Sequence, residues 1–354
     1  MAQKMTFKER FLALLQGRPM DQVPFMIYDM MLPTEALDRV LGPERIGLLR
    51  WSVVHRIVSP NCRMVVEPFT DAGLRWERRT LVTPVGTLYE EKAFEPAYDT
   101  GSIRSHFVKE PKDYDVLCAY LEDCQVVPDM DRYYRDEAEL GDRGWPLVAV
   151  HRCSWQQLWV QWAGIEDLGY HLCDDPDRVE RAIGLMQAQQ REIFEIAAAS
   201  PAPFVDFPDN ITAPCIGPRR FRKYCVPMYN ELADMLAERG AIATCHMDGD
   251  LKPLWKDIGA CGLRGLDSFA PAPDNDTSVA EAITMWPDKR LFVNFPSSVH
   301  LRDPEQVRQF ADEMLAVAGH SGRLEIQISE NVPHSVWRTT LPIIADACEA
   351  FGAP

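Results

Sequence analysis

Short apolar runs alternate along the chain with longer segments whose apolar residues recur at helical spacing. Eight of these runs end at or next to a residue that can take part in chemistry. They cover residues 24–29, 62–68, 146–152, 203–209, 241–248, 263–269, 290–295 and 323–330. Strands that alternate with helices are typical of βαβ units and a parallel sheet. We therefore predict an α/β fold, a (β/α)8 TIM barrel in which the chemical ends of the strands meet at one mouth.

The two halves of the chain differ in regularity. After the fourth run, strands and helices alternate without interruption, and the segment 217–240 is predicted to be a helix closed by Gly240. The first half carries an extra stretch, residues 69–145, which contains a hairpin pattern at 80–96 and two helical patterns. This stretch is too long for a single crossover. We interpret residues 1–354 as one barrel domain whose N-terminal half is elaborated by an insertion, 69–145, over the barrel mouth.

Composition and charge narrow the functional classes. The chain has 354 residues and a formal net charge of −16, with no large cluster of Lys or Arg. Such an acidic protein is a poor binder of nucleic acid or anionic membrane. The N-terminal segment lacks the features of a signal peptide, and no apolar stretch reaches the length of a membrane span. We expect a cytoplasmic protein whose ten scattered cysteines are reduced.

Nucleotide-binding and hydrolase motifs are missing from the sequence. There is no phosphate-binding loop of the G-x-x-x-x-G-K-[ST] type, no G-x-G-x-x-G after a strand and no G-x-S-x-G. The three tryptophans at 155, 159 and 162 recur at helical spacing, which is more often a core stripe than a ligand platform.

The strongest local signal is the sequence Cys-His-Met-Asp-Gly at 245–249. His246 and Asp248 are two residues apart at the end of a strand, so their side chains point to the same face and could share one metal ion or one substrate. The plainer interpretation is a histidine that ends a barrel strand and an aspartate that caps the following helix. Spacing alone leaves both interpretations open.

A second signal, Glu330, directly follows the last predicted strand. It is either a ligand at the barrel mouth or a carboxylate that caps the next helix. Together, His246, Asp248 and Glu330 form a nitrogen and oxygen ligand set that suits Zn²⁺, Fe²⁺ or Mn²⁺.

Other polar residues at strand ends are candidates for chemistry or binding. The candidate catalytic residues are Glu67, His151 and Asp209, and the candidate substrate contacts are Asp29, Asn210 and Asn294. A ring of so many ionisable strand ends favours an enzyme over a binding module that does no chemistry.

Several segments in order along the chain resemble the uroporphyrinogen decarboxylase superfamily. Residues 6–25 are similar to its opening helix and "P-D-x-V-P" strand entry, and 83–91 to the "T-P-x-G-T-L" hairpin of its methyltransferase-like branch. Residues 245–267 resemble its "H-x-C-G…L…G-x-D" segment, and 303–315 its "T-P-E-E-V" helix. The resemblance covers most of the chain and also implies a (β/α)8 barrel.

The resemblance implies one of two chemistries. Members that decarboxylate uroporphyrinogen carry an arginine-rich segment after the first strand, whereas the matching residues 26–36 contain no arginine. Cobalamin-linked methyltransferases hold zinc through His-x-Cys and a later Cys, and the matching positions here are His246, Asp248 and Glu330. Carboxylates in place of thiolates make a harder, more Lewis-acidic site.

The resulting expectation is a metal-dependent methyltransferase with zinc or another divalent metal. It would move a methyl group between a small methylated substrate, for which a methoxy compound is a candidate, a corrinoid carried by a partner protein, and a thiol or tetrahydrofolate acceptor. The alternative is a decarboxylase or related lyase that acts on a small carboxylated substrate, with Asp29, Asp209 or Asp248 as the acid.

Overall fold

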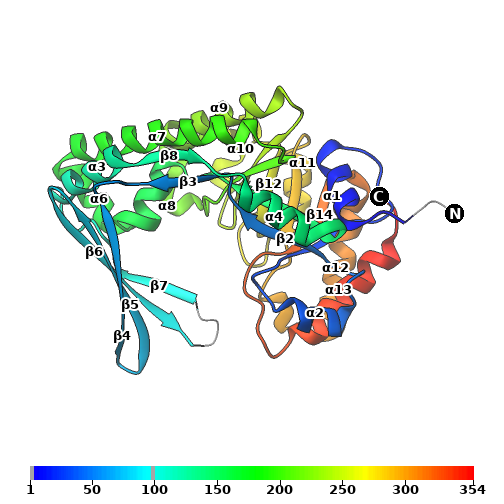
Figure 1. Ribbon diagram of the computed structural model, residues 1–354. Coiled ribbons are helices and arrows are strands. Elements are labelled where there is room, and N and C mark those ends of the chain that lie inside the picture. The colour runs from blue at the N-terminus through cyan, green and yellow to red at the C-terminus, as the bar shows by residue number, and fades with distance from the viewer. Residues whose placement is uncertain (1–3, 97–99) are drawn as a thin grey trace. The chain divides into compact units, whose positions relative to one another are not determined.

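Eight parallel strands close into a barrel in a computed structural model that describes residues 4–96 and 100–354 (Figure 1). Each strand is hydrogen-bonded to the strands that precede and follow it in the barrel, and the last pairs with the first. The predicted (β/α)8 fold is confirmed. The barrel strands are β1 (Phe25–Tyr28), β2 (Gly47–Ser52), β9 (Gly144–Ala149), β10 (Phe204–Phe207), β11 (Ile242–His246), β12 (Gly265–Phe269), β13 (Arg290–Asn294) and β14 (Leu324–Ile328).

The chain divides into two compact units. The barrel unit comprises residues up to 54, 129–150 and 197–354, and the second unit comprises 55–128 and 151–196. Residues 129–145, inside the predicted insertion, therefore belong to the barrel unit. Its helices are α1 (Phe7–Gln16), α2 (Thr34–Leu41), α4 (Asp131–Leu140), α8 (Ala213–Arg220), α9 (Val226–Ala237), α10 (Trp255–Ala260), α11 (Val279–Met285), α12 (Pro304–Ala318) and α13 (Trp337–Phe351).

The second unit contains two antiparallel sheets and several helices. A four-stranded sheet has the order β4-β5-β6-β7, and a two-stranded sheet pairs β3 with β8. The predicted hairpin at 80–96 corresponds to β5 and β6. The elements are β3 (His55–Val58), β4 (Arg63–Asp71), β5 (Leu74–Thr83), β6 (Gly86–Glu95), β7 (Thr100–Ser105), β8 (Gln125–Pro128), α3 (Asp113–Asp123), α5 (Ser154–Gln157), α6 (Ile165–Asp174) and most of α7 (Pro176–Ala199).

One of the eight predicted barrel strands is wrong. The run at 62–68 is β4 of the antiparallel sheet, and its Val66 is 51% exposed. The second barrel strand is β2, whose sequence GLLRWS includes the polar residues Arg50 and Ser52. Arg50 donates hydrogen bonds to Asp29 and Glu139, and Ser52 donates one to Asp136. These polar residues shorten the apolar run of β2 and hide it as a strand in the sequence.

The first helix of the chain, α1, has a well-formed cap at each end. Thr6 accepts a hydrogen bond from the Glu9 amide, and the Glu9 side chain accepts one from the Thr6 amide. This capping box satisfies two amides that the helix itself leaves unpaired, a contribution of about 1 kcal/mol. Gly17 ends the helix at a φ of 65°, a left-handed conformation that favours glycine.

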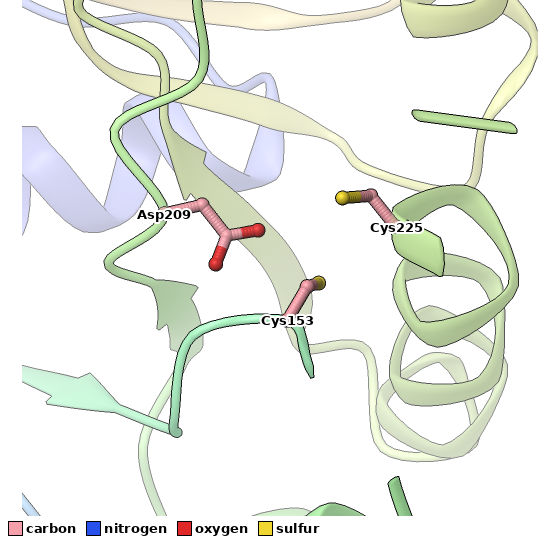
Figure 2. Close-up of side chains that lie close together, drawn as sticks. All are labelled: Cys153, Asp209 and Cys225. Atoms are coloured by element: carbon pink, nitrogen blue, oxygen red, sulfur yellow. The ribbon is translucent and has the colours of Figure 1, made fainter. Parts of the chain in front are cut away.

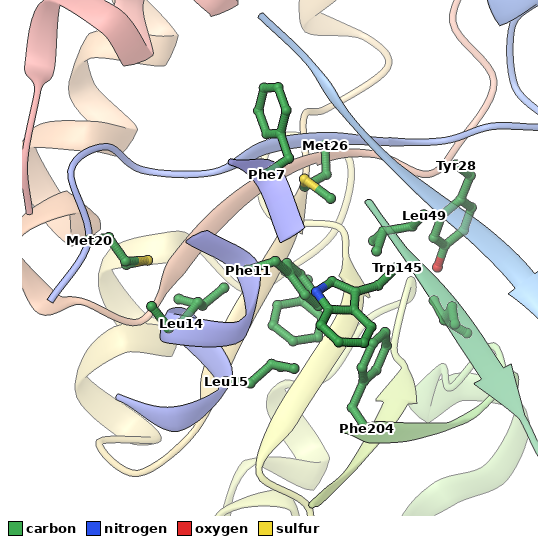
Figure 3. Close-up of a cluster of buried hydrophobic side chains, with 13 residues drawn as sticks. Phe7, Phe11, Leu14, Leu15, Met20, Met26, Tyr28, Leu49, Trp145 and Phe204 are labelled. Atoms are coloured by element: carbon green, nitrogen blue, oxygen red, sulfur yellow. The ribbon is translucent and has the colours of Figure 1, made fainter. Parts of the chain in front are cut away.

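The apolar face of α1 closes the end of the barrel where the strands begin. Phe11 is fully buried, and its ring lies 5.4 Å from that of Phe204, the first residue of β10, and 5.2 Å from that of Phe292 in β13 (Figure 3). The Trp145 indole, at the start of β9, donates to the Lys8 carbonyl over 2.9 Å. These apolar side chains fill the barrel interior at this end, and active sites of barrel enzymes lie at the opposite end.

No helix within the described residues has both the length and the apolar character needed to cross a membrane.

Candidate metal centre

Three of the predicted residues converge where the barrel strands end. His246 is the last residue of β11, and Asp248 and Glu330 lie two residues after the ends of β11 and β14. The His246 Nε2 atom is 3.6 Å from Asp248 Oδ2 and 3.4 Å from Glu330 Oε1. One ligand atom from each residue lies within 4.8 Å of the other two. The structure therefore brings together the nitrogen and oxygen donors that the sequence suggested as one set.

The backbone after β11 explains how the first two residues face the same way. An extended chain points side chains i and i+2 to one side, so Asp248 follows His246. The next residue, Gly249, packs so closely on the preceding barrel loop that a Cβ there would lie 2.3 Å from Thr212 Cβ and 2.8 Å from the Ile211 carbonyl oxygen. Glycine is required at this point because any side chain would push the loop that carries Asp248 out of place.

Two asparagines form hydrogen bonds that position Asp248 and the backbone of Glu330. The Asn210 amide donates to Asp248 Oδ2 over 2.7 Å, from a backbone with a φ of 54°. The buried Asn294 side chain accepts hydrogen bonds from the amides of Ser329 and Glu330, over 3.1 and 3.2 Å. The structure thus gives both asparagines a positioning contact, and their role as substrate contacts stays a prediction.

The far side of the His246 ring faces a buried acid. His246 Nδ1 lies 3.3 Å from Asp267 Oδ2 and 3.4 Å from the Tyr28 hydroxyl. The Tyr28 hydroxyl donates to Asp267 Oδ2, and the Gln327 amide donates to Asp267 Oδ1 over 3.2 Å. A carboxylate in this place favours a proton on Nδ1 and leaves the Nε2 lone pair to face Asp248 and Glu330.

Tyr28 and Asp267 are the residues that sequence reasoning missed. Asp267 lies in the apolar run 263–269, and Tyr28 directly precedes Asp29 in the first run. Their contact joins β1 to β12 across the barrel interior, so no local spacing announces it.

Charges in the cluster shift its pKa values in opposite directions. Burial by itself lowers the pKa of His246, but hydrogen bonds to Asp248, Asp267 and Glu330 outweigh it and hold that pKa well above 6.5. Burial raises the pKa of Asp248, yet the contact with His246 brings it below its usual value. Without a metal, a protonated His246 and its carboxylates stabilise one another, so a metal ion would replace the proton on Nε2.

The remaining candidates of the barrel unit lie outside this cluster. Asp29 accepts a hydrogen bond from Arg50 over 2.6 Å and so forms an ion pair. Asp209, on the segment after β10, accepts from the Tyr229 hydroxyl over 2.5 Å, and the Cys245 thiol is 3.9 Å away. Because Cys245 and its neighbour His246 point to opposite sides of β11, Asp209 lies on the helix side of that strand.

Figure 2 shows Asp209 on the loop that follows its strand, with Cys225 on the neighbouring helical segment; Cys153, drawn with them, belongs to the second unit. Asp209 lies on the other side of β11 from His246, and its predicted catalytic role stays a prediction.

Two catalytic candidates belong to the second unit. Glu67 lies on β4, in the middle of an exposed strand, because the segment that contains it is not a barrel strand. His151 Nε2 is 3.5 Å from His55 Nε2, and burial lowers the pKa of both rings to about 4. These two histidines are therefore neutral at pH 7.

Comparison with known proteins identifies the family of this chain. A family model described as uroporphyrinogen decarboxylase (URO-D) matches residues 98–329, more than half of the chain. The chain belongs to the uroporphyrinogen decarboxylase family. The match spans the barrel from β9 to β14, and so includes the segments of His246 and Asp248, while Glu330 follows it directly. Family membership and the closed barrel agree with the resemblance seen in the sequence.

A solved structure shares the fold of the whole chain. A methyltransferase from Methanosarcina mazei superimposes with a TM-score of 0.60 at 14% identity, covering 98% of this chain and 99% of that one. A structure from a study of the pneumococcal virulence factor StrH is similar with a TM-score of 0.41 at 11% identity, over 97% of this chain and 86% of that one. No curated protein has a significantly similar sequence.

Proposed function

We propose that this member of the family is a metal-dependent methyltransferase whose divalent ion is held by His246, Asp248 and Glu330. The observation that carries the proposal is the convergence of one imidazole and two carboxylates within 4.8 Å of one another at the end of the barrel where the strands end. The likeness in fold to a methyltransferase adds support. In barrel enzymes, this end is where active sites lie.

The donor set fits a small divalent ion. Two ligands that each lie about 2.1 Å from a tetrahedral ion are separated by about 3.4 Å. The His246 Nε2 atom lies 3.4 and 3.6 Å from its two carboxylate neighbours, so an ion could be accommodated with small side-chain movements. Nitrogen and carboxylate oxygen suit zinc and also iron or manganese.

Such an ion would act as a Lewis acid that polarises an oxygen of a methoxy or hydroxy group. The surrounding residues have roles of their own. Asp267 holds the proton on His246 Nδ1 and fixes the ring, and Asn210 keeps Asp248 turned toward the same space. The Trp51 ring, 6.3 Å from that of His246, provides an apolar surface beside the site. The methyl group would pass between a small methylated substrate, a corrinoid held by a partner protein, and a thiol or tetrahydrofolate.

A carboxy-lyase is the second candidate, favoured by one observation. A metal-free His246 with a raised pKa carries a proton beside buried carboxylates and could deliver it to the carbon that loses carbon dioxide. Against it, the lowered pKa of Asp248 makes that carboxyl a poor proton donor.

Metal content separates the two candidates. We expect purified protein to contain about one equivalent of a divalent metal by elemental analysis, and His246→Ala and Glu330→Gln to lose it. Glu67→Gln, which changes an exposed glutamate in the other unit, is the matched control and should keep the metal. A wild-type protein that binds no zinc, iron or manganese in equilibrium dialysis would refute the metal centre.

Methyl transfer is tested with methylcobalamin as the corrinoid probe. Loss of its methyl group to a thiol or to tetrahydrofolate is followed by the change in its absorption spectrum. We expect turnover by the metal-loaded wild type and none by His246→Ala. A protein that binds metal but never demethylates the probe or a corrinoid protein would overturn the methyltransferase assignment and leave the metal centre intact.

A further inference from the structure

A cavity lies in the barrel unit at the end where the strands begin, opposite the candidate metal centre. Its volume is about 580 Å³, and four arginines line it, Arg18, Arg264, Arg290 and Arg323. Arg18 follows α1. Arg264 directly precedes β12, Arg290 is the first residue of β13, and Arg323 directly precedes β14. Asp288 is the only acidic side chain among the described residues that line the cavity.

The charge of this lining contrasts with that of the chain. The whole protein carries a net charge of −16, yet here four guanidinium groups face one carboxylate side chain. Like charges so close together repel one another unless an anion lies between them.

Much of the hydrogen-bonding capacity of these arginines is unused. Arg18 makes no side-chain hydrogen bond or ion pair with any residue that the structure describes. Arg264 uses Nη1 to bind Asp288, and Arg290 donates from Nε to the Leu14 carbonyl and from Nη1 to the Asp288 carbonyl. Each guanidinium has five N–H donors, so several remain directed to no described partner.

Arg323 has a different part in the site. Its guanidinium donates to the carbonyls of Trp286, Lys289 and Ile283, over 2.8, 3.0 and 2.9 Å. It is thus a fixed structural element of the cavity wall that adds charge but few free donors. Burial lowers the pKa of Arg323, and the neighbouring Arg290 charge lowers it further, which an anion in the cavity would relieve.

We propose that this cavity binds a phosphate-bearing anion with two or more phosphate groups. Three guanidinium groups approach the cavity from different elements, and a tetrahedral phosphate presents oxygens in several directions. A single carboxylate, by contrast, has both of its oxygens bound by one bidentate guanidinium. The volume exceeds the space that one phosphate needs. The site uses none of the residues of the candidate metal centre and does not depend on the proposed function.

Titration calorimetry with inorganic pyrophosphate tests the proposal, with inorganic phosphate and ATP as further arms. We expect saturable binding of one pyrophosphate by the wild type, at least tenfold weaker binding by the double variant Arg18→Gln/Arg264→Gln, and weaker binding of phosphate. Tighter binding of ATP than of pyrophosphate would identify a nucleotide as the preferred source of the phosphates, and equal binding would identify the diphosphate alone.

Two controls make the result specific. Asp288→Asn removes the one acidic side chain and releases Arg264, so it should tighten pyrophosphate binding several-fold. Arg308→Gln changes an arginine on α12 that is paired with Asp312 and does not line the cavity, and it should leave binding unchanged. The proposal is overturned if the wild type binds no pyrophosphate, or if the double variant binds it as tightly as the wild type does.

Discussion

Replacing Asp267 by asparagine should weaken the metal centre without touching a ligand. The substitution keeps the shape of the side chain but removes its charge and turns one of its oxygens into a donor. Asp267 now accepts from Tyr28 and Gln327 and faces His246 Nδ1, all in the buried barrel interior. In Asp267→Asn at least one of these donors loses its acceptor, and the ring of His246 is no longer fixed by a carboxylate.

The expected loss of metal affinity follows from the burial of Asp267 beside His246. Replacing the residue that hydrogen-bonds the second ring nitrogen of a metal-binding histidine lowers metal affinity by about 10–100-fold, or roughly 1.4–2.7 kcal/mol. Because Asp267 is fully buried and carries the charge nearest to Nδ1, we expect a loss near the upper end, about 100-fold. Tyr28→Phe removes one hydrogen bond to the same carboxylate but leaves the charge, and should cost about tenfold or less.

The assay is a competition between the protein and a chromophoric chelator for Zn²⁺. Glu325→Gln is the matched control, since burial, followed by the nearby Asp267 charge, raises the pKa of that barrel carboxyl and favours its uncharged form, which glutamine mimics. Urea unfolding of every variant checks that the barrel is intact. The reasoning is refuted if Asp267→Asn binds Zn²⁺ within threefold of the wild type, or if Glu325→Gln loses as much affinity.

Three further predictions concern packing, pH and backbone strain. Phe11→Ala, which empties the closed end of the barrel, should lower the free energy of unfolding by about 3–5 kcal/mol in urea, and a change below 1 kcal/mol would contradict the packing. Burial lowers the pKa of His300 to about 4, so the unfolded state takes up its proton first and stability falls as the pH drops from about 6.5 toward 4. His300→Gln should therefore lose about 2 kcal/mol less than the wild type between pH 7 and pH 5, and equal losses would show that this ring does not titrate as described. Asn210→Gly should keep the fold and weaken metal binding several-fold, whereas Asn210→Ala should also destabilise the protein by about 1 kcal/mol, because alanine tolerates the left-handed backbone poorly; equal unfolding midpoints would contradict the strain.

Most of the barrel was predictable because the seven strands other than β2 are almost wholly buried and most of their residues are apolar. The exception shows the limit of that signal. The strand β2 points Arg50 and Ser52 at carboxylates of the same unit, so its sequence resembles a surface segment, while the apolar residues of β4 mimic a buried strand although they are exposed. Whether such a segment becomes a barrel strand depends on contacts with residues distant in sequence, and the apolar pattern of the segment alone does not contain that information.

The candidate site was predictable to the same degree. The two-residue spacing of His246 and Asp248 indicated their shared face, and the position of Glu330 after the last strand indicated the same end of the barrel. Tyr28 and Asp267 were missed because their contact connects strands that are 239 residues apart in sequence. Glu67 was misplaced because its strand was assigned to the wrong sheet, and only the pairing of β4 with β5 corrects it.

The closure of the barrel by α1 has a consequence for the order of folding. The phenyl ring of Phe11 packs against Phe292, and β1 finds one of its two neighbours only in β14. At ribosomal rates of about 5–20 residues per second, the first helix and strand wait roughly 15–60 s for these partners to be synthesised. During that time their apolar faces are open to other contacts. The N-terminal segment should therefore be the part of this chain that depends most on chaperones during synthesis, and closing the ring should be the slow, late step of folding.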